Sequence, residues 1–138
     1  MHIWLLRRSR EGKRFDEVPS IEPKTVAEGI RVGLVPGPYP IDAMKESKGE
    51  GVLVSDEEIL SAEKELASSE GMFCEPSSAA TVAGLRKLLD EGVIDRSDTV
   101  VCVITGAGLK DPDSASKLIG KPPLIKPKME ELKKIVEK

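Results

Sequence analysis

The apolar positions of this chain fall into runs, and the clearest run lies near residue 100. Residues 99–105 read Thr-Val-Val-Cys-Val-Ile-Thr, which predicts a strand buried on both faces of a parallel sheet. Shorter apolar runs at residues 51–54 and 72–74 predict two further strands. We expect the three runs to lie in one open α/β sheet.

Two helices are predicted between these runs. Ser55 followed by Glu58 forms a capping-box pattern, and the helical spacing of apolar residues that follows stops before Gly71. The second helix starts within residues 75–78 and ends at Gly92. It is apolar around much of its circumference, as buried helices are. The order strand–helix–strand–helix–strand predicts right-handed parallel crossovers.

The flanks of this central region are more polar and carry shorter elements. The expected elements there are a strand over residues 2–6, a loop over 7–24, a helix over 25–32, a turn over 36–40, one or two helical turns over 41–47, a proline-rich linker near 122–127 and a short amphipathic helix over 128–137. We therefore expect one main domain at residues 1–120, followed by a linker and helix at 121–138.

Composition limits the classes of function. With 138 residues, a net charge of −3 and 3% aromatic residues, the chain is expected to form one domain with an aliphatic core. The basic residues are scattered, which disfavours nucleic acid as a partner. No apolar run approaches the roughly twenty residues of a membrane span. Cys74 and Cys102 lie in apolar runs and are expected to be reduced, which favours the cytoplasm.

Metal and triad chemistry are disfavoured by the same composition. The one histidine, His2, lies at the N-terminus, away from the serines that open the second helix. We therefore expect neither a Ser-His triad nor a Cys–His metal site.

Polar residues gather where the predicted elements meet. Thr105 and Gly106 follow the buried strand, at the sheet edge where open α/β sheets bind ligands. Ser77 and Ser78 open a helix whose free amides favour an anion, although ordinary N-capping would explain one of them. Glu75 either orients a ligand or satisfies its own loop.

Two neighbouring features have simpler explanations. Lys110 and Asp111 are expected to be exposed turn residues. Gly106-Ala-Gly108 is half of a dinucleotide-binding fingerprint, but the third glycine is missing, and Pro112 interrupts the helix that such a motif requires. We therefore do not expect a dinucleotide site.

Four motifs follow one another along the chain: Pro23-Lys-Thr-Val-Ala-Glu-Gly-Ile-Arg-Val-Gly33, Val54-Ser-Asp-Glu-Glu-Ile59, Glu70-Gly-Met-Phe-Cys-Glu-Pro-Ser-Ser-Ala-Ala80 and Thr105-Gly-Ala-Gly-Leu-Lys-Asp-Pro112. In this order they resemble the C-terminal part of the threonine synthases, a family of pyridoxal-phosphate (PLP) enzymes. The resemblance extends from residue 5 to about residue 115. It implies an incomplete part of the tryptophan synthase β-like fold, with a parallel sheet in a three-layer α/β arrangement.

The resemblance also implies a cofactor site. Thr105 would lie at the pyridine nitrogen of PLP, with Gly106 beside it, and Glu75, Ser77 and Ser78 would line the pocket. A hydroxyl partner leaves that nitrogen unprotonated, which weakens the electron sink. In the family, the Schiff-base lysine and the phosphate-binding loop lie in the part that precedes the region resembled here.

No catalytic residue is therefore expected in this chain, and it is not expected to be active alone. The resemblance implies a missing N-terminal half or a second chain as partner, a homodimer as the complete enzyme, and the conversion of O-phosphohomoserine and water to threonine and phosphate. Alternatives are a non-catalytic binding or regulatory remnant of the fold, or part of a cysteate synthase or threonine dehydratase. Ala107 stands where the family commonly has His or Asn, and the segment after Gly33 lacks the usual Asn-Pro.

Overall fold

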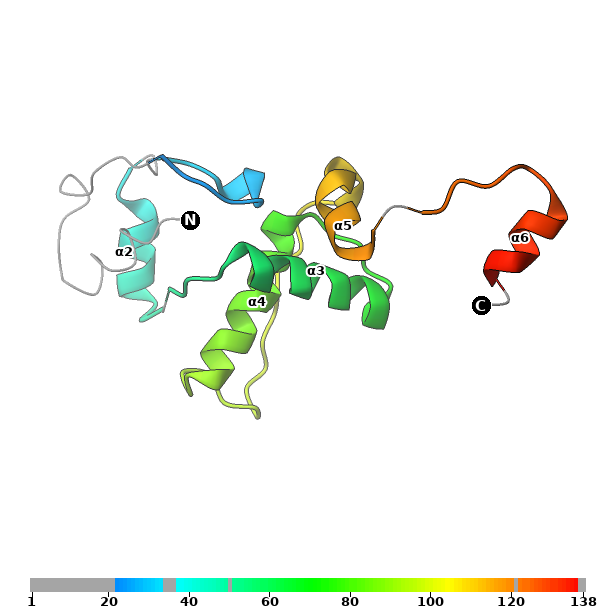
Figure 1. The fold of residues 1–138 in the computed structure, drawn as a ribbon. Coiled ribbons are helices and arrows are strands. Elements are labelled where there is room, and N and C mark those ends of the chain that lie inside the picture. Colours follow the sequence, from blue (N-terminus) through cyan, green and yellow to red (C-terminus); the bar gives the residue numbers. More distant parts are fainter. Residues whose placement is uncertain (1–21, 34–36, 50, 121, 137–138) are drawn as a thin grey trace.

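The computed structural model describes residues 22–33, 37–49, 51–120 and 122–136 (Figure 1). The strand expected at residues 2–6 and most of the loop expected at 7–24 lie outside these ranges. The elements of the described residues are η2 (Glu28–Ile30), α2 (Tyr39–Glu46), α3 (Asp56–Glu70), α4 (Pro76–Asp90), η3 (Gly108–Lys110), α5 (Pro112–Ile119) and α6 (Met129–Val136).

Helix α3 begins and ends where its sequence predicts. The Ser55 hydroxyl accepts from Glu58 N at 3.2 Å, and the Glu58 carboxylate accepts from Ser55 N at 2.5 Å, so the predicted capping box is confirmed. At the other end, Gly71 has a φ of +66°, a left-handed conformation that glycine adopts without strain. These two local signals fix the length of the helix.

Helices α3 and α4 pack against each other and supply most of the core (Figure 1). Ile59 and Ala62 of α3 and Ala79 of α4 are fully buried. The segment before α3 lies close to α4. A Cβ added at Gly84 would be only 3.1 Å from a methyl carbon of Val52. The prediction that α4 is a buried helix holds for its first half, where Pro76 to Gly84 contribute its buried positions.

The parallel sheet expected from the sequence is not formed by the described residues. The segments 51–54, 72–74 and 99–105 carry no strand there, and one antiparallel bridge joins Cys74 to Ala107. Val101 and Val103, predicted to be buried on both faces, are 82% and 64% exposed. A parallel strand exists only when neighbouring strands accept and donate its hydrogen bonds. The described residues supply no such neighbours to these segments.

The helix expected over residues 25–32 is reduced to the short turn η2. Thr25 Oγ1 donates to Asp56 Oδ1 at 2.6 Å, and Val26 N donates to the same oxygen at 3.2 Å. These contacts hold the start of the segment to the N-terminus of α3 and compete with helical hydrogen bonds. The helical turns expected over residues 41–47 are confirmed as α2, which begins two residues earlier than expected, at Tyr39.

Helix α5 was not predicted from the sequence. Pro112 does not interrupt a helix but occupies its first position, where the missing N–H costs nothing. Asp111 caps this helix through Oδ1, which accepts from Ser114 N at 3.2 Å. The final short helix is confirmed as α6, and Figure 1 shows it at the end of an extended segment, away from α3 and α4. The expected domain division at residue 120 stays a prediction.

Within the described ranges, no helix is both long and apolar enough to cross a membrane.

Candidate functional site

The N-terminus of α4 lies against the loop of residues 105–108, called the glycine loop below. Glu75 N donates to Gly106 O at 3.0 Å, and Gly108 N donates to Phe73 O at 3.0 Å. The segment before α4 and the glycine loop, about thirty residues apart in sequence, are thus held edge to edge by backbone hydrogen bonds. The two segments lie together as the sequence indicated, and the ligand site expected between them stays a prediction.

Ser78 lies at the centre of this contact. Its side chain is 1% exposed, and its hydroxyl oxygen accepts from Thr105 N at 3.0 Å and from Gly106 N at 2.9 Å. The same oxygen lies 3.2 Å from Thr105 Oγ1. Thr105 itself is exposed. The arrangement is a buried serine hydroxyl that holds the backbone of the loop and, in contact with it, the hydroxyl of an exposed threonine.

Ser77 points to a different neighbour. Its hydroxyl oxygen accepts from Gly29 N at 2.9 Å, which joins the start of α4 to η2. Gly29 has little room for a side chain, because a Cβ there would lie 2.9 Å from Ser77 Oγ. The two adjacent serines therefore make separate contacts, one to the glycine loop and one to η2.

Glu75 is held by Lys110, which was expected to be an exposed turn residue. The Glu75 carboxylate lies 2.7 Å from Lys110 Nζ, and the Glu75 side chain is only 13% exposed. It makes no side-chain cap on α4. Lys110 belongs to η3, so this ion pair ties the start of α4 to the far end of the glycine loop, and a ligand contact of Glu75 stays a prediction.

The glycines of the loop allow this close packing. A Cβ on Gly106 would overlap the Glu75 carboxyl group, and a Cβ on Gly108 would overlap the Phe73 ring. Neither glycine has a positive φ. Their role is close approach between segments rather than an unusual backbone conformation.

Glu63 is a buried acid that was not predicted from the sequence. It lies on α3, is 1% exposed, and neither carboxylate oxygen has a hydrogen-bond partner among the described residues. Burial raises the pKa of Glu63, and the nearby charge of Asp111 raises it further. The burial of Glu63 could have been predicted from the sequence, because helical spacing places it on the same apolar face of α3 as Ile59, Ala62 and Leu66.

The surrounding groups keep this acid in an electronegative environment. Hydrogen bonds from Ser114 lower the pKa of Asp111, so its carboxylate stays charged. Burial raises the pKa of the Cys74 thiol, and the charges of Glu63 and Glu75 add to that effect. Cys74 is therefore a protonated, unreactive thiol at neutral pH.

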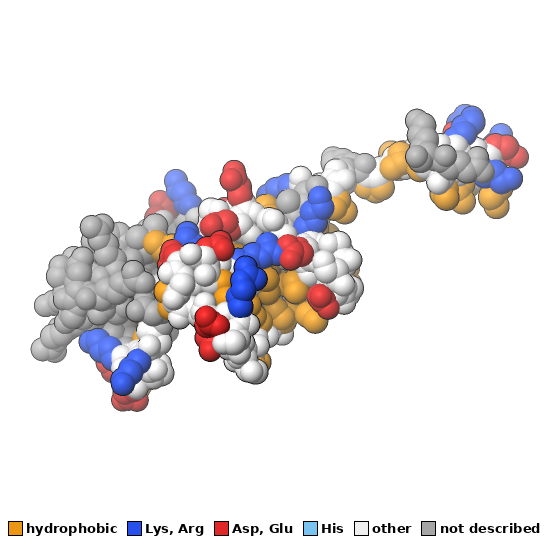
Figure 2. All heavy atoms as spheres, turned by 90° about the horizontal axis from the view of Figure 1, so that it is seen from below, with side chains coloured by type: hydrophobic (Ala, Val, Ile, Leu, Met, Phe, Trp, Pro, Cys, Tyr) orange, Lys and Arg blue, Asp and Glu red, His pale blue; other side chains and the backbone are white. Residues whose placement is uncertain are grey.

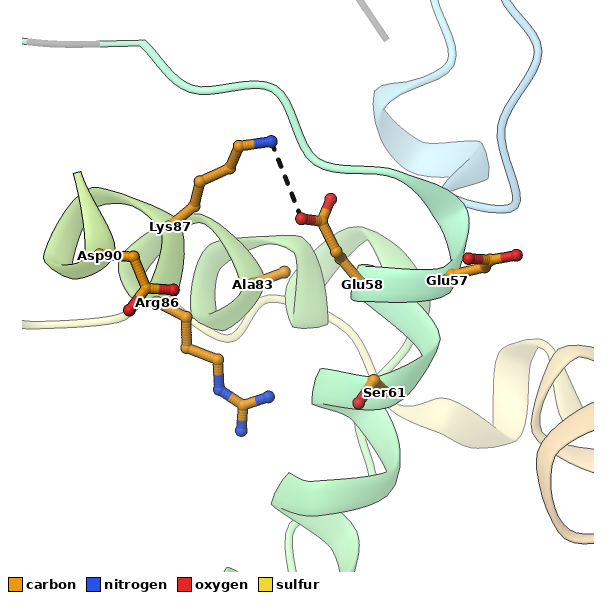
Figure 3. Close-up of a pocket in the computed structure, with 7 residues that line it drawn as sticks. All are labelled: Glu57, Glu58, Ser61, Ala83, Arg86, Lys87 and Asp90. Carbon is orange, nitrogen blue, oxygen red and sulfur yellow. Dashed lines mark ion pairs between the residues drawn. The ribbon is translucent and has the colours of Figure 1, made fainter.

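A separate pocket of about 380 Å³ lies between α3 and α4 (Figure 3). Figure 3 shows Lys87 pointing toward Glu58, with Lys87 Nζ 3.7 Å from Glu58 Oε1. Arg86, also in the lining, pairs with Glu65. The cations of this pocket already have acidic partners, and none of the site residues predicted from the sequence lines it.

Comparisons with known proteins assign a family to most of the chain. The family described as "Pyridoxal-phosphate dependent enzyme" matches residues 5–106. The threonine synthase of Methanocaldococcus jannaschii is 47% identical over 123 residues, which cover 88% of this chain and 30% of that protein. The threonine synthase of Methanosarcina acetivorans is 49% identical over 108 residues, which cover 78% of this chain and 27% of that protein.

A solved structure gives a consistent result. The crystal structure of a threonine deaminase from T.th. matches 79% of this chain and 37% of that chain, with a TM-score of 0.54 and 26% sequence identity. The chain spans less than a third of the length of the curated relatives above. In this structural comparison, too, the match covers the smaller part of the longer protein.

Proposed function

Because the chain belongs to the family of pyridoxal-phosphate-dependent enzymes, we propose that it forms the C-terminal part of a threonine synthase. The complete enzyme is a lyase that acts on a carbon–oxygen bond to phosphate, and converts O-phosphohomoserine and water to threonine and phosphate. Identities of 47% and 49% to threonine synthases, against 26% to the threonine deaminase structure, favour this substrate over that of a dehydratase.

The residues at the α4 N-terminus fit the cofactor that the family name implies. A pyridine nitrogen needs one hydrogen-bond partner, and Thr105 presents an exposed hydroxyl beside the start of α4, backed by the buried Ser78. The hydroxyl of this exposed threonine, held against the start of α4 by its contact with Ser78, is the observation that carries the proposal. When bound, PLP supplies the electron sink for the chemistry at the substrate's β and γ carbons.

The chain's own residues would build one wall of the pocket. Thr105 binds the ring nitrogen, and Gly106 lies beside it, where the absence of a side chain leaves room for the Glu75 carboxyl group. Ser77 and Ser78 place the start of α4 beside the ligand. Glu75, paired with Lys110, holds the loop in place rather than touching the reacting atoms. No residue of this chain is assigned a catalytic role.

The remaining part of the enzyme, which carries the Schiff-base lysine and the phosphate loop, comes either from further sequence of the same protein or from a second chain. We assign the complete enzyme to the cytoplasm as a homodimer. The free cysteines Cys74 and Cys102 support a reducing compartment. The exposed valines of segment 99–105 support assembly with further strands.

The test is reconstitution. The chain is combined with the lysine-bearing part of a threonine synthase and PLP, and two signals are recorded: the absorption band of lysine-bound cofactor, and release of phosphate from O-phosphohomoserine. Both are expected, and neither from the chain alone. Absence of both signals from the combined protein overturns the proposal, and a band without phosphate release supports a related PLP enzyme or a non-catalytic remnant instead.

A second measurement checks the assignment of Thr105. Thr105→Ala in the assembled enzyme is expected to shift the cofactor's absorption band and to lower turnover by a factor of about 10 to 100, as loss of one site hydrogen bond does. An unchanged spectrum and turnover would remove Thr105 from the site.

A further inference from the structure

We infer that Ser78 is a positioning residue that fixes the direction of the Thr105 hydroxyl, so that Thr105 donates its proton outward to an unprotonated ring nitrogen. The inference rests on the proposed function, because it concerns the same site, but it makes a separate claim about which atom carries which proton.

The claim follows from the hydrogen bonds that Ser78 makes. A serine hydroxyl has two acceptor lone pairs and one proton. Thr105 N, at 3.0 Å, and Gly106 N, at 2.9 Å, are both donors only, so they occupy the two lone pairs. Ser78 is 1% exposed, so water does not readily replace these contacts. What remains on Ser78 is its proton.

That proton has one partner among the described contacts of Ser78, which is Thr105 Oγ1 at 3.2 Å. If Thr105 were the donor instead, three donors would compete for the two lone pairs of the Ser78 oxygen. The proton of Ser78 would then be buried without an acceptor. A buried polar group without a hydrogen-bond partner destabilises the folded state. The balance of donors and acceptors therefore selects Ser78 as donor and Thr105 Oγ1 as acceptor.

Thr105 is then left with its own proton directed away from Ser78. The residue is exposed, so this proton is available to a ligand bound at the loop, as the proposed function requires. A hydroxyl fixed as a donor binds an unprotonated nitrogen and opposes a protonated one, because two protons would face each other. Ser78 thereby sets the protonation state of the ring without touching it.

The experiment uses the complete, PLP-loaded enzyme, with the pyridine nitrogen of the cofactor labelled with ¹⁵N. The wild type is expected to give the NMR resonance of an unprotonated, hydrogen-bonded pyridine nitrogen over the whole pH range of activity. Ser78→Ala is expected to move that resonance toward the position seen with Thr105→Val, which lacks the donor. It is also expected to weaken cofactor binding about tenfold, the effect of one net hydrogen bond.

Ser114→Ala is the matched control. Ser114 is another buried serine, 4% exposed, and its hydroxyl donates to Asp111 rather than to a group of the site. Its loss is expected to lower stability while leaving the ¹⁵N resonance in place. A Ser78→Ala resonance equal to that of Ser114→Ala would overturn the inference while leaving the proposed function intact. A wild type that binds no PLP would refute the proposed function itself.

Neutron diffraction on the deuterium-exchanged wild-type holoenzyme covers the case in which Ser78→Ala does not fold. The Ser78 deuteron is expected on the line to Thr105 Oγ1, and the Thr105 deuteron on the line to the ring nitrogen. A Thr105 deuteron directed at Ser78, or a deuteron on the ring nitrogen, would overturn the inference.

Discussion

At the scale of single residues, close packing around the glycine loop depends on two glycines that have no side chain. Gly106 faces the Glu75 carboxyl group, and Gly108 faces the Phe73 ring, so a methyl group at either position would collide with its neighbour. The Glu75 side chain is paired with Lys110, so moving it aside would disturb that ion pair. We therefore expect substitutions at Gly106 and Glu75 to affect each other.

Gly106→Ala is expected to displace the Glu75 side chain, lower the free energy of unfolding by about 1–3 kcal/mol and weaken cofactor binding in the assembled enzyme. A double-mutant cycle with Glu75→Ala tests whether the collision with Glu75 causes this loss of stability, with unfolding followed by denaturant titration. The cost of Gly106→Ala should shrink in the Glu75→Ala background, because the colliding group is gone. Equal costs in both backgrounds would show that the collision is not the reason.

Glu63 gives a prediction about pH. Its pKa is higher in the folded state than in the unfolded chain, so the folded state binds more protons between the two values. Its contribution to stability is present below the ordinary glutamate pKa, about 4.3, and is lost as pH rises through the raised pKa.

Glu63→Gln is therefore expected to remove this loss of stability and to raise the free energy of unfolding at neutral pH relative to the wild type. Glu70→Gln on the exposed end of the same helix is the control, and should change the pH profile little. Denaturant titrations from pH 4 to pH 8 measure both. A Glu63→Gln profile that runs parallel to the wild type would contradict the prediction.

At the scale of elements, the parts of the fold that could be predicted from the sequence are those encoded by neighbouring residues. The capping box of Ser55 and Glu58 and the left-handed Gly71 define α3 without reference to distant parts of the chain. The strand at 99–105 was predicted from its apolar run, but its ladder depends on partners elsewhere. The turn η2 escaped prediction because Asp56, about thirty residues away in sequence, holds the segment before it. The signal for helix α5 is local, but Pro112 was expected to interrupt a helix rather than to begin one.

The candidate site divides in the same way. Ser78, Thr105, Gly106 and Glu75 were predicted to lie together because strand ends and helix starts were expected to meet at one edge, and the contacts of Ser78 show that the two segments do meet. The contacts of Lys110 with Glu75 and of Gly29 with Ser77 depend on how the chain folds back, and no local pattern records them.

Ser55→Ala is expected to lower the free energy of unfolding by about 1 kcal/mol, because the amide of Glu58 loses its acceptor at the start of α3. Ser61→Ala, at an exposed interior position of the same helix, should leave stability within about 0.5 kcal/mol of the wild type. Thermal unfolding by circular dichroism measures both variants. Two equal melting temperatures would argue against the capping contribution.

At the scale of the whole molecule, much apolar surface is left uncovered. Figure 2 shows hydrophobic side chains gathered between charged ones on one face of the body, and along the segment that leads to α6. Val101, Val103 and Leu109 are each more than half exposed. Exposed apolar surface of this extent is typical of a part that packs against further protein.

Val103→Glu is expected to prevent assembly with the lysine-bearing part of the enzyme, because it would bury a charge in the completed sheet. Val93→Glu, which also replaces a half-exposed valine but lies after α4, should assemble normally. Co-purification and the amount of PLP retained measure the outcome, with a loss of roughly tenfold or more expected for Val103→Glu. Normal assembly of Val103→Glu would place the interface elsewhere.

The link between Ser78 and Thr105 also bears on the order in which the chain folds. The two residues are 27 positions apart, and the 15-residue helix α4 occupies much of that interval. Once α4 has formed, only the stretch from Asp90 to Thr105 has to close, and halving a loop saves about 0.6 kcal/mol of closure entropy. The contact between Ser78 and Thr105 is thus local in sequence once α4 is formed. During synthesis all of its residues are present as soon as the glycine loop has left the ribosome, before the residues of α5 and α6 have been added.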